Sequence, residues 1–251
     1  MNTTSTRRLP DISSCGLHIL AMALMLCDHL WATLLPQYDL LTHIGRIAFP
    51  IFAFLLAEGS RRTRHPQQYL LRLTRFALLA EIPFNMMYSG SVIYPYHQNV
   101  LWTFLIALMG VFATRAAAEK TRRRWVGVLV GALCILMGFV LGTLAMTDYY
   151  GFGVLTVWLF VLFPGTTWRQ RLGQAVGLYL INWQWLAGEM LTVTVAGHAV
   201  EFPEQGLALL ALIPIWLYRG RQGYHSKGFQ YVCYAFYPAH MLLLSAIMLL
   251  R

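Results

Sequence analysis

Residues 125–146 read WVGVLVGALCILMGFVLGTLAM, and this stretch carries no charged side chain. An α-helix needs about 20 mostly apolar residues to cross the roughly 30 Å hydrocarbon core of a bilayer, so the stretch predicts a membrane-spanning helix. The whole 251-residue chain agrees, because 58% of its residues are hydrophobic and only 12% are charged, whereas soluble domains have about 25% charged residues. This composition excludes a water-soluble globule, a disordered chain and a disulfide scaffold.

Eight more stretches of about 15 to 20 mostly apolar residues recur along the chain, and each predicts a helix that crosses or enters the bilayer. The nine expected spans are residues 16–35, 44–58, 69–88, 100–118, 125–146, 151–163, 172–191, 206–218 and 231–250. The sixth and eighth are short, so each could be less tilted, half-buried or re-entrant. Neither an internal repeat nor a long linker divides the chain. We therefore expect an all-α fold, a polytopic integral membrane helical bundle of about nine transmembrane helices that forms one domain over residues 1–251.

Basic residues fall on alternate connections between the expected spans. All of them except Arg46 and Arg251 lie before the first span, around the start of the third, or after the fourth, sixth and eighth: Arg7, Arg8, Arg61, Arg62, Arg64, Arg72, Arg75, Arg115, Lys120, Arg122, Arg123, Arg124, Arg169, Arg171, Arg219, Arg221 and Lys227. The opposite connections carry acids and neither Lys nor Arg: Asp39, Asp148, Glu189, Glu201 and Glu204. The positive-inside rule then predicts a cytoplasmic N-terminus. Topology accounts for the net charge of +9, and we expect no nucleic-acid partner.

A few titratable side chains lie within the expected spans. Each costs about 2.5 to 3.5 kcal/mol to insert, so each needs a structural partner or a function. The set is Asp28, His29, Arg46, Glu58, Glu81 and His240. Asn85 shares a helix face with Glu81 across Pro83, and Tyr237 shares one with His240 across Pro238. Polar residues on the outer side of the predicted topology complete the candidate site: His97, Gln98, Asn99, Asp148 and Tyr149.

Structural roles are the alternative for each of these residues. Polar side chains commonly hydrogen-bond helices together in membranes. Asp28 and His29 project about 100° apart on a helix, so they could face different neighbours. Arg46 has no acid on its own helix, and Asp28 or Glu81 could pair with it. Glu58 is within reach of the arginines three and four residues later, and a solvated ion pair explains it.

The chemistry that fits these residues best is proton transfer, because a neutral imidazole can accept a proton from a hydroxyl or an amine. Cys15, Cys27, Cys134 and Cys233 are scattered without metal-ligand spacing, so neither a disulfide nor a metal site is predicted. The chain has no HExxH, nucleophile-elbow or P-loop motif. An intramembrane acid–base enzyme, a proton-coupled transporter and a non-catalytic assembly protein remain open. The absence of repeated halves favours the enzyme over the transporter.

Six segments at these positions resemble the TraX family of bacterial membrane proteins. They are CDHLW (27–31), GRIAFPIFAFLLAEG (45–59), LRLTRFALLAEIPFN (71–85), HQNVLWTF (97–104), DYYGFGVL (148–155) and YAFYPAHMLLL (234–244). The TraX family is named for an acetylase of conjugative pilin. It is similar to other multispanning acyltransferases, including heparan-alpha-glucosaminide N-acetyltransferase. In those enzymes an acyl-CoA enters from the cytoplasm and an intramembrane histidine serves an acceptor on the far side.

By this resemblance Asp28, His29, Arg46, Glu81 and His240 match polar positions of the family, and the buried Asp-His and the cytosolic arginines lead to a hypothesis for the role of each group. His29 would act as general base, with Asp28 or Glu81 stabilising its imidazolium and His240 in reserve. Arg46 or Asn99 would polarise the reacting carbonyl. The other substrate-binding candidates are Asn85, His97, Gln98, Asp148, Tyr149 and Tyr237. The phosphates of acetyl-CoA or another acyl-CoA would bind Arg61, Arg62, Arg64, Arg72 and Arg75, although these arginines could equally receive an anionic lipid.

The resemblance also sets the expected location and partners. We expect a multi-pass protein of the bacterial inner (cytoplasmic) membrane that contacts membrane lipids and uses acyl-CoA as co-substrate. The acceptor is unidentified and could be a protein N-terminus, a glycan, a lipid or a small metabolite. Direct transfer and a covalent acyl-histidine are both consistent with the residues.

Overall fold

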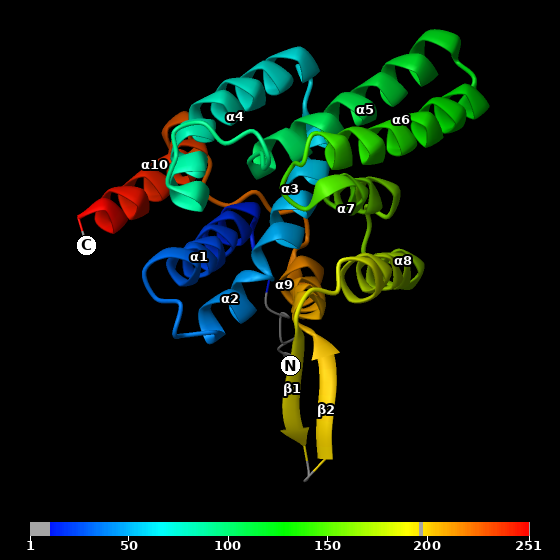
Figure 1. Ribbon diagram of the computed structural model, residues 1–251. Coiled ribbons are helices and arrows are strands. Elements are labelled where there is room, and N and C mark those ends of the chain that lie inside the picture. Colours follow the sequence, from blue (N-terminus) through cyan, green and yellow to red (C-terminus); the bar gives the residue numbers. More distant parts are fainter. Residues whose placement is uncertain (1–10, 196–197, 251) are drawn as a thin grey trace, which may run out of the picture.

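A computed structural model describes residues 11–195 and 198–250, which form a helical bundle with one β-hairpin (Figure 1). The elements in chain order are α1 (Ser14–Thr33), α2 (Leu40–Gly45), α3 (Ala48–Arg62), α4 (Pro66–Ser89), α5 (Val100–Thr121), α6 (Arg124–Leu144), α7 (Tyr150–Leu162), α8 (Trp168–Tyr179), the π-helix η1 (Leu180–Trp185), β1 (Met190–Val195), β2 (His198–Pro203), the 3-10 helix η2 (Glu204–Ala211), α9 (Leu212–Leu217) and α10 (Lys227–Leu249). Three of the basic residues named above, Arg7, Arg8 and Arg251, lie outside the described residues.

Five helical stretches of the described chain are long and apolar enough to cross a membrane. They are Ser14–Thr33, Leu40–Arg62, Val100–Thr121, Arg124–Leu144 and Lys227–Leu249. Two shorter apolar helices, Tyr150–Leu162 and Glu204–Leu217, coincide with the sixth and eighth expected spans, which the sequence already marked as short. The protein is therefore a helical membrane protein.

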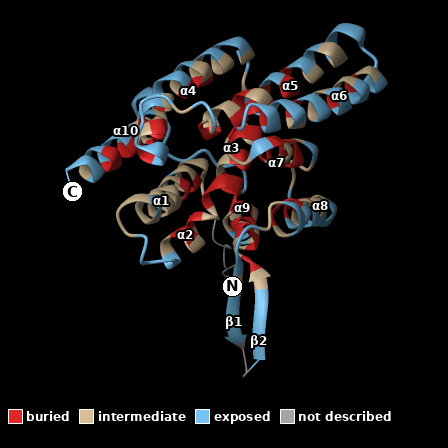
Figure 2. Ribbon diagram, viewed as in Figure 1, coloured by how far each residue is buried: buried red, intermediate tan, exposed pale blue. Residues whose placement is uncertain are grey.

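Helix α3 forms the centre of the bundle, as Figure 2 shows by its buried colour. Its Ile51 and Ala53 are fully buried, and it packs against α1, α5 and α7. The lipid-facing part of the bundle is clearest on α6, where Leu129, Leu133 and Leu136 are 58 to 61% exposed. The opposite face of α6 carries buried glycines that let α5 and α7 approach closely: Gly127, Gly131, Gly138 and Gly142.

The expected second span is broken, and the break places Arg46. Helix α2 ends at Gly45 and α3 begins at Ala48. Pro50 lies in the first turn of α3 and has no N–H to donate to the carbonyl of Arg46, four residues earlier. A continuous helix is therefore disfavoured at this point, and Arg46 lies in the two-residue break between α2 and α3.

The expected all-α fold is incomplete, because part of the expected seventh span is a strand. The helical segment that begins at α8 ends with η1 at Trp185, and β1 starts at Met190. The two strands are antiparallel, with Met190 opposite Pro203, and the hairpin projects from the bundle (Figure 1). The sequence of β1, MLTVTV, is rich in β-branched residues, which favour strands.

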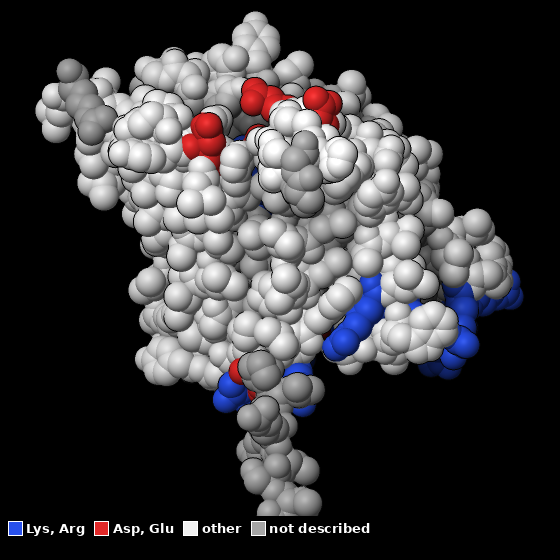
Figure 3. All heavy atoms as spheres, turned by 90° about the horizontal axis from the view of Figure 1, so that it is seen from below, with Lys and Arg blue, Asp and Glu red and all other residues white. Residues whose placement is uncertain are grey.

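Charge divides the molecule into two sides. In Figure 3, acidic side chains gather around a hollow at one edge of the face, and basic side chains gather at the opposite edge. This separation agrees with the alternation of basic and acidic connections along the sequence.

Candidate active site

A pair of histidines joins α1 and α10, which pack against each other. Nδ1 of His29 lies 2.6 Å from Nε2 of His240, and the two rings are nearly parallel, at 13° to each other, with centroids 4.8 Å apart. Nδ1 of His240 lies 2.6 Å from the backbone carbonyl oxygen of Phe236 in the preceding turn. His240 is buried, at 6% exposure, and His29 is partly buried.

This chain of contacts determines which nitrogens carry protons when both rings are neutral. The carbonyl of Phe236 can only accept a hydrogen bond, so Nδ1 of His240 must be the protonated nitrogen. Nε2 of His240 is then an acceptor, and Nδ1 of His29 must donate to it. Nε2 of His29 is consequently left with its lone pair, in the form in which an imidazole accepts a proton.

The partner of His29 is therefore not the one expected. Asp28 or Glu81 was expected to stabilise its imidazolium, but His240 occupies that position. The roughly 100° between neighbouring residues on α1 explains why, since it turns Asp28 toward α2 while His29 faces α10. Tyr237 lies on the same side of α10 as His240, with its ring centroid 6.3 Å from that of His29, and is itself buried.

Asp28 instead belongs to a second cluster, which is built around Arg46. Nη2 of Arg46 lies 3.5 Å from Oδ1 of Asp28, and its Nε donates to Oε1 of Glu204 at 3.3 Å. Thr42 receives a hydrogen bond from Arg46 at 2.5 Å and donates one to Asp28 at 2.9 Å. Gly45 makes this approach possible, because a Cβ there would lie 2.5 Å from the Cβ of Asp28.

Arg46 holds this cluster together, and replacing it with leucine is expected to destabilise the fold. Arg46→Leu would leave the carboxylates of Asp28 and Glu204 half-buried without a cation, and hydrogen bonds to charged groups contribute about 1.5 to 3 kcal/mol each. We expect a clear drop in the melting temperature of the detergent-solubilised protein. Arg221→Leu is the matched control. It removes an ion pair with Asp11, but the side chain of Arg221 is largely exposed, and such a surface ion pair contributes little to the stability of the fold. Equal melting temperatures for the two variants would contradict this role.

Glu81 does not contact Arg46, although it was one of the two partners expected. Its Oε2 accepts hydrogen bonds from Nδ2 of Asn99 and, at 2.9 Å, from Nε1 of Trp102. Asn99 is fully buried. Its Nδ2 also donates to the carbonyl of Ala77, and its Oδ1 accepts from the amide of Leu101 as the N-cap of α5. These bonds give Asn99 a structural role, and its expected role in polarising a substrate carbonyl stays a prediction.

Four of the expected outer residues do come together. Asp148 lies 3.7 Å from Nε2 of His97, and its backbone amide donates to the carbonyl of Gln98. Tyr149 stacks on Phe49 at 3.9 Å between centroids and interacts electrostatically with Arg46. This group therefore extends the Arg46 cluster. Asn85 lies apart from it, buried and bonded to the carbonyl of Val92 at 3.3 Å.

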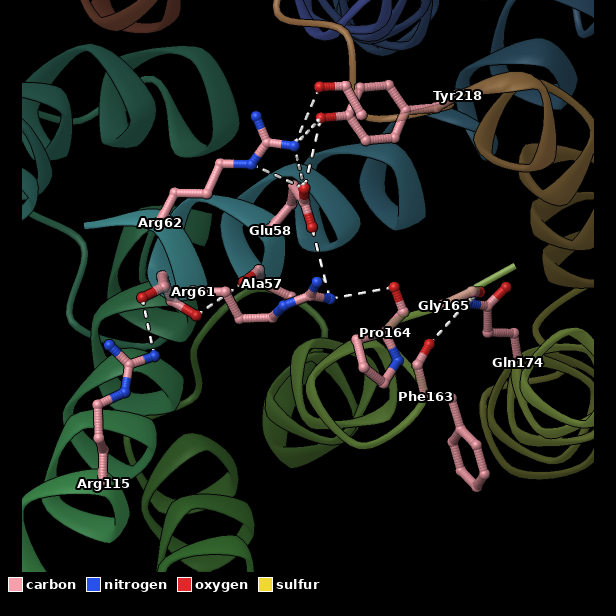
Figure 4. Close-up of polar contacts among 12 residues, drawn as sticks. Ala57, Glu58, Arg61, Arg62, Arg115, Phe163, Pro164, Gly165, Gln174 and Tyr218 are labelled. Carbon is pink, nitrogen blue, oxygen red and sulfur yellow. Dashed lines mark hydrogen bonds and ion pairs between the residues drawn. The ribbon is translucent and has the colours of Figure 1, made fainter. Parts of the chain in front are cut away.

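On the basic side, Glu58 binds two of the expected cofactor arginines (Figure 4). Oε1 of Glu58 lies 2.6 Å from Nη2 of Arg62, and Oε2 lies 3.5 Å from Nη1 of Arg61. Burial, together with this carboxylate, raises the pKa of Tyr218. Its hydroxyl therefore stays protonated, donating to Glu58 at 3.4 Å and accepting from Arg62 at 3.0 Å. The ion pair expected at Glu58 is present, and it partly neutralises both arginines.

Two cavities share the Glu58–Arg62 ion pair as part of their walls. The α1–α10 cavity, of about 450 Å³, is lined by residues that include Cys15, His18, Arg62, Arg72, Leu101 and Tyr234. The α8–α9 cavity, of about 590 Å³, is lined by residues that include Glu58, Arg61, Arg62, Arg171, Trp216 and Arg219. Of the expected cofactor arginines, Arg64 and Arg75 are exposed and line neither cavity.

Two of the polar partners in the site were not singled out from the sequence. They are Glu204, which the sequence places on an outer connection, and Thr42, an uncharged residue next to an apolar span. Their sequence neighbourhoods carry little signal, because Glu204 follows the hairpin and reaches Arg46 from a segment 158 residues away. The sequence feature that relates Glu204 to the site is its place on an acidic connection of the outer side.

These features define a helical membrane protein with a buried histidine pair and with polar clusters toward two opposite sides. The chain belongs to the TraX protein family, whose model matches residues 13–248. It is also similar to the probable fimbrial assembly protein FimC, serogroup H1, of Dichelobacter nodosus, with 28% identity over 249 residues that cover 96% of this chain and 98% of that protein. No solved structure matches the chain.

Proposed function

We propose that this protein is a membrane-embedded acyltransferase that moves an acyl group, most simply acetyl, from cytosolic acyl-CoA to an amine or hydroxyl acceptor. The observation that carries the proposal is the hydrogen-bonded chain from Phe236 through His240 to His29, which leaves Nε2 of His29 unprotonated. A neutral imidazole held in one tautomer is well suited to general-base catalysis.

The proposed step begins with the acceptor against Nε2 of His29. This nitrogen takes the proton of the attacking N–H or O–H while the new bond to the acyl carbon forms. The C–S bond of the thioester breaks, and the departing thiolate of CoA receives the proton back from His29. The positive charge on His29 is shared with His240 through their hydrogen bond, whose Nδ1–H is itself oriented by the carbonyl of Phe236.

The α1–α10 cavity supports a route for the acyl-CoA. Arg62, Arg72 and His18 contribute positive or titratable groups to its wall, and Leu101 and Phe104 line an apolar part. Tyr234 belongs to the same wall and precedes His240 by six residues of α10, about 9 Å along the helix. Phosphates held by the arginines would thus leave the acyl arm directed along α10 toward the histidine pair.

The acceptor is proposed to approach from the opposite, acidic side, through the group that contains Arg46, Asp148 and Tyr149. The relative from Dichelobacter nodosus is named for fimbrial assembly. That name favours a protein subunit of a surface fibre among the possible acceptors. The proposal also includes nine membrane passages, a cytoplasmic N-terminus and location in the bacterial inner membrane, in keeping with the charge alternation along the chain.

Binding of acetyl-CoA to the purified protein tests the proposal, with Arg72 as the residue changed. Arg72→Ala is expected to weaken binding about tenfold, because a charge-assisted contact to phosphate is lost. Arg75→Ala is the matched control, since Arg75 lies three residues further along α4 but is exposed and outside both cavities. Calorimetry in detergent gives the affinities.

Two results of that titration would contradict the proposal. One is an equal loss of affinity for both variants, which would mean that surface charge alone attracts acetyl-CoA. The other is no binding at millimolar acetyl-CoA by folded protein, which would favour the proton-coupled transporter. Because Arg72 also lies over the rings of Tyr69 and Tyr234 at 5.3 and 5.2 Å, Arg72→Lys and a melting curve without ligand separate binding from folding.

A further inference from the structure

The proposed acyl-CoA route uses only part of the lining of the α8–α9 cavity, the shared residues Glu58, Arg62 and Tyr218. This cavity is bounded by the end of α3, the turn between α7 and α8, and the segment around α9 (Figure 4). Among the described residues, four arginines and one carboxylate line it: Arg61, Arg62, Arg171, Arg219 and Glu58. Because Glu58 is shared between the first two arginines, the cavity keeps an excess of positive charge.

Arg171 is held at the wall of this cavity by Trp216. Its guanidinium lies over the ring of Trp216, 5.4 Å from the centroid, and its Nη2 donates to the backbone carbonyl of Trp216 at 3.3 Å. Its Nε is buried and has no hydrogen-bond partner among the described residues. A guanidinium fixed by stacking at the wall of a cavity is well prepared to bind an oxyanion.

The rim of the cavity is held rigid by Gln174, which is 1% exposed. Its Nε2 donates to the carbonyls of Phe163 and Gly165 at 2.6 and 3.3 Å (Figure 4). Its Oε1 accepts a hydrogen bond from Nε1 of Trp216 at 2.8 Å. The same side chain therefore fixes the α7–α8 turn and the ring on which Arg171 lies. The site is preorganised, so binding would require little ordering of these groups.

The position of the cavity favours a ligand at the level of lipid headgroups. Trp168 and Trp216 lie beside Arg169 and Arg171, and tryptophan is enriched where helices meet the membrane surface. Basic pockets between helices on the cytoplasmic side are typical sites for anionic lipid headgroups. Helix α8 also starts just after the rim residue Thr166, and the N-terminus of a helix favours anions.

We propose that the α8–α9 cavity is a phosphate-binding site. The phosphate can be carried by the headgroup of an anionic phospholipid or by the adenosine phosphates of a cytosolic cofactor. Arg61, Arg171 and Arg219 line this cavity and not the α1–α10 cavity, and Arg62 and Glu58 form the wall shared by the two. This inference does not depend on the acyltransferase activity.

The test uses the full chain in neutral detergent with two probes, a short-chain phosphatidylglycerol and adenosine 3′,5′-bisphosphate. Binding is followed by calorimetry for the wild type and for Arg171→Ala and Arg219→Ala. Arg169→Ala is the matched control, since Arg169 lies two residues away on α8, is exposed and does not line the cavity. A melting curve without probe verifies folding, and Arg171→Lys keeps the charge where Arg171→Ala fails to fold.

We expect saturable binding of one probe that Arg171→Ala and Arg219→Ala each weaken about tenfold and that Arg169→Ala leaves within twofold. Weakened binding of phosphatidylglycerol alone identifies a lipid as the carrier, and weakened binding of the bisphosphate alone identifies the cofactor. An equal loss in the Arg169→Ala control, or no saturable binding of either probe by folded protein, overturns the proposal. Loss of acyl transfer has no bearing on these binding curves, so the two proposals fail independently.

Discussion

His29→Asn is expected to lower the rate of acyl transfer by about 10² to 10⁴-fold, the usual contribution of a positioned general base. Asparagine is close in size to histidine and its amide N–H can still donate to Nε2 of His240, so the contact between α1 and α10 is kept. What it lacks is the lone pair of Nε2. We therefore expect kcat to fall while acetyl-CoA affinity and melting temperature stay near their wild-type values.

The measurement is the transfer of radiolabelled acetyl from acetyl-CoA into membranes that contain equal amounts of each protein. His43→Asn is the control, because His43 is a histidine of α2 outside the proposed chain of hydrogen bonds, and it should leave the rate unchanged. Wild-type turnover by a folded His29→Asn protein would remove His29 from the mechanism.

His240→Ala is expected to give the second-largest effect, a loss of about a hundredfold in kcat. His240 is a positioning residue in this account, since it fixes the tautomer and the orientation of the His29 ring rather than contacting substrate. Without it, Nδ1 of His29 loses its acceptor at 2.6 Å and the ring can present a protonated Nε2 instead. The KM for acetyl-CoA should change little, because His240 does not line the α1–α10 cavity.

His240→Gln distinguishes positioning from packing. The amide oxygen of glutamine can accept the hydrogen bond from Nδ1 of His29, so this variant is expected to recover much of the activity lost by His240→Ala. A purely structural histidine predicts a different pattern, in which melting temperature and kcat fall together in both variants. Comparable kcat values for His240→Ala and the wild type would exclude a positioning role.

Much of the helical architecture could be predicted from apolar length alone. The expected spans at residues 16–35, 100–118 and 125–146 correspond to α1, α5 and α6 within a few residues. Window hydropathy does not separate a helix from a strand, and it therefore extended the seventh span into β1. It also started the second span at residue 44, before the break between α2 and α3, because it takes no account of the missing N–H of Pro50.

The chemistry-bearing residues could be named from the sequence, but their pairing could not. The cost of burying charge singles out Asp28, His29 and His240, whereas which of them touch depends on how α1 is rotated against α2 and α10. The two histidines are 211 residues apart, so no local spacing links them. The arginines show the same limit, since only the packing of α4 against α10 separates the cavity-lining Arg72 from the exposed Arg75.

The most direct test of the central claim uses sealed inside-out membrane vesicles supplied with radiolabelled acetyl-CoA on their exposed cytoplasmic face. The account predicts that vesicles with the wild-type protein incorporate label into a protein, lipid or glycan fraction, and that vesicles with His29→Asn do not. Right-side-out vesicles with the wild-type protein should also stay unlabelled, because the cofactor must enter from the cytoplasm. Equal labelling with and without His29, or no labelling by wild-type protein that binds acetyl-CoA, would contradict the claim that this protein is an acyltransferase.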